Sequence, residues 1–383
     1  FHVCGAVPVY DRDGPPSLAV FQRAGGGVNV AVGVVPAGRG DSGATFYRGG
    51  AGWQGEVATV FEPPRVLQPG EAVRADGMWL TYGHDHAAPV DLYYGWTLGR
   101  IYEEKVRRQG PRAWVTVSDD AGLDDLAGLV AKAVPLGVRH ALVPALWEGR
   151  PGSLIGAAPR YPRKMSRVAD ALRQAGAAPG ITIDPLLTDE GKAPWAARSE
   201  DGRMWLNPRT EAGAARLGER VRAVLDWGFD FIVVQPTEMP DVVLGHFGLA
   251  RAAADWAALR AVKTAAEKHP VYPAAADALE AGRDPWLAAA AGVARMARYG
   301  AAVGPVELNA GGVEAFDAET EAALRLWPGP LQLSALPGRG AREALRRVVT
   351  APRLSTAPMA AAEEAPRLWR VFLDPEADAS PQA

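Results

Sequence analysis

The sequence predicts an α/β fold in which a (β/α)8 TIM barrel follows an N-terminal antiparallel β-sandwich. Two observations carry this prediction. From Arg112 onward, short apolar runs alternate with amphipathic helical segments, a pattern typical of parallel strands connected by helices. Before residue 90, short strand-like runs are separated by Pro-Gly, Asp-Gly and Gly-Gly turns, as in an antiparallel sandwich.

The barrel prediction rests on strands counted along the chain. Strands are expected at residues 113–117, 138–144, 180–183, 229–234, 269–273, 301–308, 331–333 and 353–355. Helices are expected between them at residues 123–134, 164–174, 210–225, 250–267, 284–298, 318–326 and 342–349. The fourth strand is the clearest, because Gly228 ends a helix and a buried apolar run follows it. Polar residues after each strand are candidates for function, since the carboxyl ends of the strands form the active face of such a barrel.

Four segments are predicted. Residues 1–90 form the sandwich, with strands at residues 28–35, 45–47, 56–61, 65–67 and 78–82. Residues 91–110 form a linker helix that ends at Gly110-Pro111. Residues 111–357 form the barrel, and residues 358–383 form a C-terminal strand, at residues 367–373, and a loose tail.

Composition bounds the class of protein. The 383 residues are 48% hydrophobic and 22% charged, as in a soluble globular protein. The net charge of −3 favours neither a nucleic acid nor an anionic membrane as a partner. No apolar run approaches the roughly 18 residues of a membrane helix. The chain starts at Phe1, so the compartment, cytoplasmic or secreted, stays open, as does the oligomeric state.

Neither a cofactor nor a metal is expected. The single cysteine, Cys4, excludes an intramolecular disulfide and a cysteine zinc cluster. His84-Asp-His86 has the alternation of two ligands on one strand face, but no third ligand is evident, which favours a surface loop. The Gly25-Gly26-Gly27 run lacks the lysine and the helix of a phosphate-binding loop.

Several stretches in order resemble the retaining α-galactosidases and raffinose-synthase-like (melibiase-like) glycoside hydrolases. The resemblance runs from about Gly70 to Leu354, and it is carried by Ala113-Trp-Val-Thr-Val117, Ala145-Leu-Trp-Glu148, Tyr161-Pro-Arg-Lys-Met165, Pro179-Gly-Ile-Thr-Ile-Asp-Pro185, Leu206-Asn-Pro208, Asp226 to Gln235 and Pro330-Leu-Gln-Leu-Ser334. It implies the same sandwich and barrel, and a saccharide as substrate or ligand.

The sequence also departs from that family. Gln235 stands where the resemblance calls for the nucleophilic aspartate at the end of the fourth strand, and Val233 replaces a lysine. The paired aspartates of the second strand become Pro144 and Ala145. Because an amide is a poor nucleophile and carries no charge, a two-carboxylate mechanism would lose one partner.

Three carboxyl groups are candidates for a relocated catalytic pair: Glu307, Glu238 and Asp184. Glycosidic hydrolysis needs two carboxyls that flank one bond, roughly 5 to 9 Å apart. Glu307 lies late in the sixth predicted strand, where the acid/base is expected by chain order, and Asp184 ends the third. Glu238 follows Gln235 and could replace the nucleophile if its loop folds over the mouth; a solvated loop acid is the other interpretation.

Substrate contacts are predicted from residues after the strands: Trp147, Glu148, Trp205, Gln235, His246 and Asp119. Aromatic faces stack on sugars, but Trp147 and Trp205 could equally be packing residues. Asp119 could instead cap the following helix.

Two functions from different classes follow. One is an α-galactosidase-like hydrolase with a shifted carboxylate pair. The other is a catalytically inactive relative that binds carbohydrate or serves as a structural partner. The sugar and its linkage are not specified by the sequence.

Overall fold

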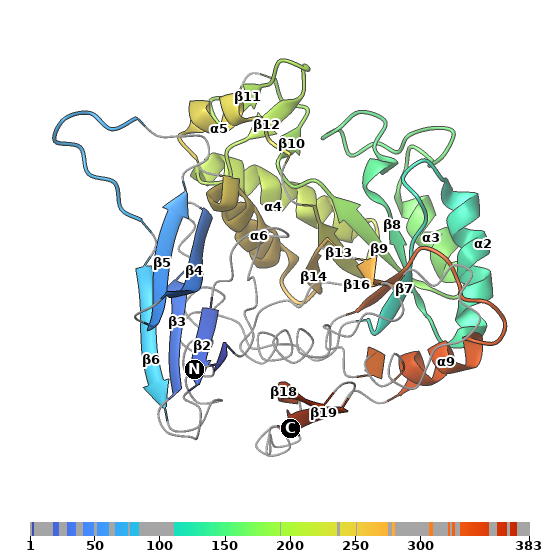
Figure 1. The fold of residues 1–383 in the computed structure, drawn as a ribbon. Helices are drawn as coiled ribbons and strands as arrows, with labels where there is room; N and C mark the ends of the chain where they lie inside the picture. Colours follow the sequence, from blue (N-terminus) through green and yellow to red (C-terminus); the bar gives the residue numbers. More distant parts are fainter. Residues whose placement is uncertain are drawn as a thin grey trace.

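The computed structural model describes residues 2–3, 18–22, 29–35, 41–49, 52–60, 66–75, 77–83, 111–191, 193–235, 238–249, 251–274, 278–279, 306–308, 321, 324–325, 330–351, 358–365 and 368–373. Its largest element is a curled parallel sheet covered by helices (Figure 1). The sheet contains β7 (Ala113–Val115), β8 (His140–Val143), β9 (Ala178–Ile183), β13 (Phe231–Val234), β14 (Val271–Pro273), β15 (Ala278–Leu279), β16 (Val306–Leu308) and β17 (Leu331–Leu333).

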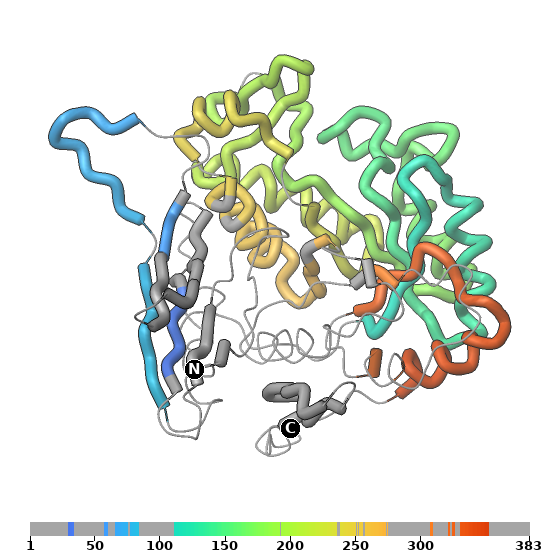
Figure 2. The backbone as a smooth tube through the Cα atoms, viewed as in Figure 1, coloured from blue at the N-terminus to red at the C-terminus, as the bar shows by residue number. Residues whose placement is uncertain are grey.

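The strand order is that of a half-barrel curling toward closure. The order across the sheet is β14-β13-β9-β8-β7-β17-β16-β15, and every neighbouring pair is parallel. Starting at β7 and going round the curl, the strands follow one another in chain order: β7, β8, β9, β13, β14, β15, β16 and β17. Figure 2 shows the segment of β17 beside that of β7, although they are far apart in the sequence. The arrangement agrees with the predicted TIM-like barrel.

The position predicted for the eighth strand is wrong. Strand β17 pairs directly with β7, from Leu331 opposite Ala113 to Leu333 opposite Val115, so no strand lies between them. Residues 353–355, where that strand was predicted, lie outside the described residues. The eighth member of the sheet is instead β15, which starts five residues after the end of β14. A two-residue strand has no apolar pattern of its own, because its pairing with β16 defines it.

The helices match their predicted ranges within a few residues. They are α2 (Leu123–Ala133), α3 (Ser166–Gln174), α4 (Glu211–Asp226), α6 (Arg251–Ala266) and α9 (Arg342–Thr350), with 3-10 turns η1 (Val134–Leu136) and η2 (Ala145–Trp147). Helix α4 starts at the N-cap Thr210, whose hydroxyl accepts a hydrogen bond from the Gly213 N–H, and buries Leu217, Val221 and Val224 against the sheet. The helix predicted at residues 284–298 lies outside the described residues.

Two insertions at the carboxyl edge of the sheet were not predicted. After β9, the strands β10 (Leu187–Thr188), β11 (Ala196–Arg198) and β12 (Met204–Leu206) form a small antiparallel sheet. After β13, the short helix α5 (Asp241–Phe247) lies near β11 (Figure 1). Both are too short to produce a periodic sequence pattern.

The antiparallel character of the N-terminal region is confirmed. Strands β1 (His2–Val3), β2 (Leu18–Gln22), β3 (Asn29–Val35) and β6 (Gly77–Gly83) form one antiparallel sheet, and β4 (Asp41–Gly49) pairs with β5 (Gly52–Val60). That these two sheets form a sandwich stays a prediction. The strand expected at residues 65–67 is wrong, because Val66 and Leu67 are exposed and belong to no strand.

The remaining predicted segments are partly described. The linker helix of residues 91–110 and the tail beyond residue 373 lie outside the described residues. The predicted C-terminal strand is present as β19 (Leu368–Leu373), which pairs with β18 (Pro358–Ala365) in an antiparallel hairpin.

The concave and convex faces of the parallel sheet carry separate apolar cores. Side chains alternate along each strand, so Ile232 and Val234 join the core under the helices while Phe231 and Val233 face the interior of the curl. In that interior the ring of Trp114 stacks on Phe231 with centroids 5.2 Å apart, and its Nε1 donates to Gln332 Oε1 at 3.1 Å. Tyr272 completes the aromatic cluster, 5.5 Å from Trp114.

We predict that Gly180→Ala destabilises the protein. An added Cβ would lie 2.1 Å from Cζ of Phe231, so the aromatic cluster would have to shift. Overpacking of this kind costs about 1–3 kcal/mol, measurable by urea unfolding. The control is Gly128→Ala in α2, where an added Cβ meets nothing within 4 Å, and which should stabilise by about 0.5–1 kcal/mol. Equal stability of the two variants would contradict the packing described for β9 and β13.

Candidate functional site

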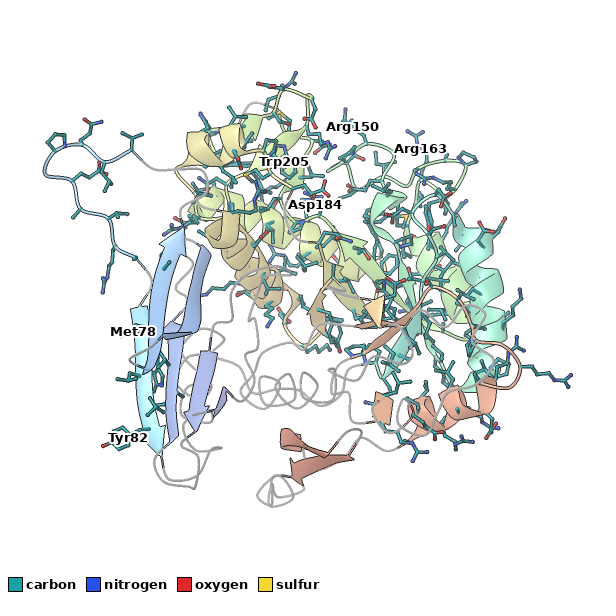
Figure 3. The ribbon with its side chains drawn as sticks, in the orientation of Figure 1. Met78, Tyr82, Arg150, Arg163, Asp184 and Trp205 are labelled. Atoms are coloured by element: carbon teal, nitrogen blue, oxygen red, sulfur yellow. The ribbon has the colours of Figure 1, made fainter. Side chains whose placement is uncertain are left out.

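The carboxyl ends of β8, β9 and β13 form one edge, where three predicted site residues follow the strands. Val143 is in register with Ile181, and Ile183 with Val234. The Gln235 N–H donates to the carbonyl of Ile183 at 3.0 Å, so Gln235 lies beside Asp184 at this edge. Glu148 follows η2, which continues directly from β8. Figure 3 shows Asp184 among side chains of this edge, with Arg150 and Trp205 nearby.

Asp184 is a carboxyl group held in surroundings that disfavour its charge. Burial raises its pKa to about 6, and the negative charge of Glu148 adds to the rise. The backbone N–H of Leu186, which donates to Oδ1 at 3.1 Å, and the positive charge of Arg220 act in the opposite direction. The Asp184 carboxyl therefore titrates near pH 6, where most exposed aspartates are already ionised.

Arg220 brings a positive charge into the layer between α4 and the sheet. Only 7% of the residue is exposed. Its Nη2 lies 3.7 Å from Glu148 Oε1, and burial lowers its pKa while the two carboxylates raise it. An arginine stays protonated even so, because its guanidinium pKa starts so high. Its Nε and Nη1 have no hydrogen-bond partner among the described residues.

Glu148 organises the loop of residues 149–155. Its Oε2 accepts a hydrogen bond from the Gly152 N–H at 2.7 Å, and its Oε1 accepts one from the Leu154 N–H at 2.9 Å. The loop needs this support because Leu154 has a φ of 57°, a conformation that is costly for a residue with a side chain; Gly152, with a φ of 81°, adopts it freely. A Cβ at Gly152 would also lie 2.6 Å from the backbone of Thr188. The Glu148 side chain is only 12% exposed, and it contacts both the loop and Arg220.

The two tryptophans at this edge are core residues by their burial, which supports the packing interpretation. Trp147 is 1% exposed and Trp205 is 0% exposed. The indole N–H of Trp147 donates to the Thr182 carbonyl at 2.7 Å, and that of Trp205 to the hydroxyl of Ser199 at 3.0 Å. Because the rings are almost completely buried, neither ring face is exposed to a ligand in this structure.

Two predicted contact residues, Asp119 and His246, and the predicted catalytic residue Glu238 lie at the surface. Asp119 Oδ1 accepts a hydrogen bond from the Ala145 N–H at 3.1 Å, which ties the end of β7 to η2; the cap of α2 is Gly122 instead. The Glu238 side chain is 81% exposed, and its Oε2 lies 3.9 Å from Nη1 of Arg203, as expected for a loop acid. His246 is exposed on α5, with its ring near that of Phe247.

Glu307 faces the interior of the curl and not the helical layer. Its neighbour Leu308 belongs to the core under the helices, so alternation directs Glu307 to the opposite face, level with Gln332 of β17. Strands β8, β7 and β17 lie between β9 and β16. The structure therefore brings Asp184 together with Glu148 and Arg220, and places Glu307 elsewhere.

Sequence reasoning missed Arg220 and Arg203. Arg220 lies within the apolar stripe of Leu217, Val221 and Val224 on α4, and a charge inside such a stripe is the signal that could have found it. Arg203 precedes β12 and reaches both Asp201, at 2.9 Å, and the distant Glu238. Nothing in its local sequence indicates that second contact.

A metal site and a membrane-spanning helix are both absent from the part of the chain that the structure describes. There, no group of three or more His, Cys, Asp or Glu residues is arranged to hold a metal ion. His84-Asp-His86 lies outside the described residues. Among the described helices, none combines the length and the apolar character needed to span a bilayer.

No known family profile matches the sequence, and no curated protein matches it. Solved structures do resemble the fold. An α-galactosidase from Thermus thermophilus, in complex with p-nitrophenyl α-D-galactopyranoside, superposes with a TM-score of 0.55 at 15% identity, covering 93% of this chain and 79% of that one. The GH36 α-galactosidase AgaB from Geobacillus stearothermophilus gives 0.54 at 11% identity, over 87% and 55% of the two chains.

A third similar structure is the galactosidase domain of an α-galactosidase–sucrose kinase, with a TM-score of 0.55 at 11% identity, covering 87% of this chain and 54% of that one. This chain thus spans little more than half the length of the second and third structures. At such identities the likeness establishes an α-galactosidase-like fold.

We predict that Glu148→Gln destabilises the protein by about 3 kcal/mol, because it removes the carboxylate that forms the ion pair with the buried guanidinium of Arg220. Urea unfolding measures the loss, and faster proteolysis within residues 149–155 should accompany it. The control is Glu343→Gln, whose exposed carboxylate lies 3.9 Å from Arg346 and should contribute less than about 0.5 kcal/mol. Similar losses in both variants would argue against the anchoring role of Glu148.

Asp184→Asn should change how stability depends on pH. The folded pKa, about 6, lies above the roughly 3.9 of an unfolded aspartate, so the folded state binds more protons between these values. Wild-type stability should therefore fall relative to the variant as pH rises from 4 to 6, by at most about 3 kcal/mol. Denaturant titrations at each pH measure this difference. The exposed variant Asp170→Asn is the control, and a pH-independent difference for Asp184→Asn would contradict the burial argument.

Proposed function

We propose that this protein binds a saccharide at the carboxyl edge of its parallel sheet without hydrolysing it. The α-galactosidase-like fold supports the ligand class, because structures of this fold hold p-nitrophenyl α-D-galactopyranoside, stachyose or raffinose. The carboxyl edge supports the place, since α/β barrels bind their ligands there.

The observation that carries the binding function over hydrolysis is the identity of the residue that ends β13. Gln235 follows Val234 directly and lies beside Asp184. Its amide can donate to and accept from sugar hydroxyls, but it offers no charge to an oxocarbenium-like transition state and no nucleophile. Gln235 can therefore bind a sugar hydroxyl at the position where hydrolysis would need a carboxylate.

The hydrolytic alternative requires a second carboxyl close to the first. The sequence offers two such pairs: Glu307 with Asp184, or Glu307 with Glu238. Asp184 lines the small cavity against α4, whereas alternation along β16 directs Glu307 toward the interior of the curl. Glu238 extends into solvent with 81% of its side chain exposed. This arrangement favours recognition over bond cleavage.

The test measures binding and turnover on the same preparation. Galactose, raffinose and stachyose at millimolar concentrations should raise the unfolding temperature, because a ligand of the folded state stabilises it by mass action. Galactose release from raffinose should stay at the background rate. Gln235→Ala should weaken binding by about 2–10-fold, the worth of one neutral hydrogen bond. The matched control is Gln174→Ala, at the exposed end of α3, which should bind as the wild type does.

Two results would overturn the proposal. Unchanged unfolding temperatures with all three saccharides would exclude the ligand class. Galactose release that Glu307→Gln abolishes would instead show a live hydrolase with a relocated carboxylate pair.

A further inference from the structure

A small cavity lies between the end of β9 and helix α4. Its walls are apolar, contributed by Ile183 of β9, Leu154 of the loop that Glu148 holds, and Leu217 and Val221 of α4. Two polar side chains enter it from opposite elements: Asp184 from the strand end and Arg220 from the helix. The cavity is therefore a small, mostly apolar space that an acceptor, Asp184, and a donor group, Arg220, both line.

The guanidinium of Arg220 has more donors than the protein satisfies. Nη2 faces Glu148 Oε1 at 3.7 Å, while Nε and Nη1, both fully enclosed, lack a hydrogen-bond partner in the described part of the chain. A buried N–H of a charged group costs more than about 1–3 kcal/mol when it is left without an acceptor. Native proteins fill such positions with an oxygen atom from protein, water or ligand.

Size and charge restrict what can supply that oxygen. The cavity measures ≈ 10 Å³, and one buried water needs roughly 10–15 Å³ on this measure. An anion would face the carboxylates of Glu148 and Asp184, and a cation would face Arg220. A neutral O–H group is repelled by neither the carboxylates nor the guanidinium, because it accepts a hydrogen bond from the guanidinium and donates one to the Asp184 carboxylate.

We propose that the Asp184–Arg220 cavity is a binding site for a single neutral hydroxyl oxygen, provided by a water molecule or by one hydroxyl group of a polyol ligand. The oxygen accepts a hydrogen bond from Nε or Nη1 of Arg220 and bridges it to Asp184. This goes beyond the proposed function, because the site exists in the free protein whether or not a saccharide binds.

The deciding experiment is a crystal structure of the wild-type protein at a resolution that shows ordered water, in a buffer free of polyols. A single oxygen peak within about 3.2 Å of both Arg220 and the Asp184 carboxylate is expected. A chamber without density, or a guanidinium turned to bond Asp184 directly, would overturn the proposal. The wild-type chain suffices for this result.

A second crystal, soaked in D-galactose, identifies the source of the oxygen. Replacement of the peak by a sugar hydroxyl assigns the cavity to the saccharide site, and an unchanged peak beside a sugar bound elsewhere assigns it to water. Both agree with the proposal, and absence of bound galactose counts only against the proposed function. In Arg220→Met the oxygen should disappear, whereas Arg222→Met, on the exposed face of α4, should keep it.

Discussion

A guanidinium sealed beneath the carboxyl edge of the sheet is the constraint on which the candidate site depends. Moving an ion from water to the protein interior costs several kcal/mol after relaxation, so Arg220 is tolerable only where opposite charge and acceptors surround it. Glu148 supplies the charge at 3.7 Å, and in doing so it fixes its own position under the loop of residues 149–155. The shape of that loop follows from where Arg220 lies.

Burial raises the pKa of Asp184, and the charge of Arg220 opposes that rise. Two carboxyls and one guanidinium leave one excess negative charge in surroundings of low polarity. Glu148 already accepts two backbone N–H groups of the loop and faces the guanidinium. Asp184 is buried beside them, and burial raises its pKa to about 6. Loop geometry and proton affinity are thus two consequences of one buried cluster.

Periodicity predicted most of the parallel sheet, because buried strands and amphipathic helices of ordinary length leave clear patterns. It failed where tertiary pairing alone defines the element. Strand β15 has two residues and no pattern, so the chain count placed a strand at residues 353–355, between β17 and β7, where the pairing leaves no room. The small sheet of β10, β11 and β12 was missed for the same reason.

The site was predicted in part. Asp184 and Glu148 could be named because carboxyls after strands are conspicuous. Arg220 was missed because helix charges are usually exposed, and its place inside the apolar stripe of α4 was the only sequence signal of its burial. The tryptophans were ambiguous for another reason. An indole at a strand end can contact a ligand or pack in the core, and the choice depends on tertiary burial, which here covers both rings and gives each N–H an interior acceptor.

Binding a sugar and hydrolysing it need different arrangements of charged groups at the carboxyl edge of the sheet. A hydrolase needs two carboxyls about 5–9.5 Å apart on the same side of a bond. Here Asp184 lines the cavity against α4, and Glu307 faces the interior of the curl, with three strands between β9 and β16. Turning Asp184 toward Glu307 would strip Arg220 of one of its two carboxyl neighbours. The charge that stabilises the edge therefore supports the proposed binding function over the hydrolytic alternative, with the neutral Gln235 as its candidate contact to a sugar hydroxyl.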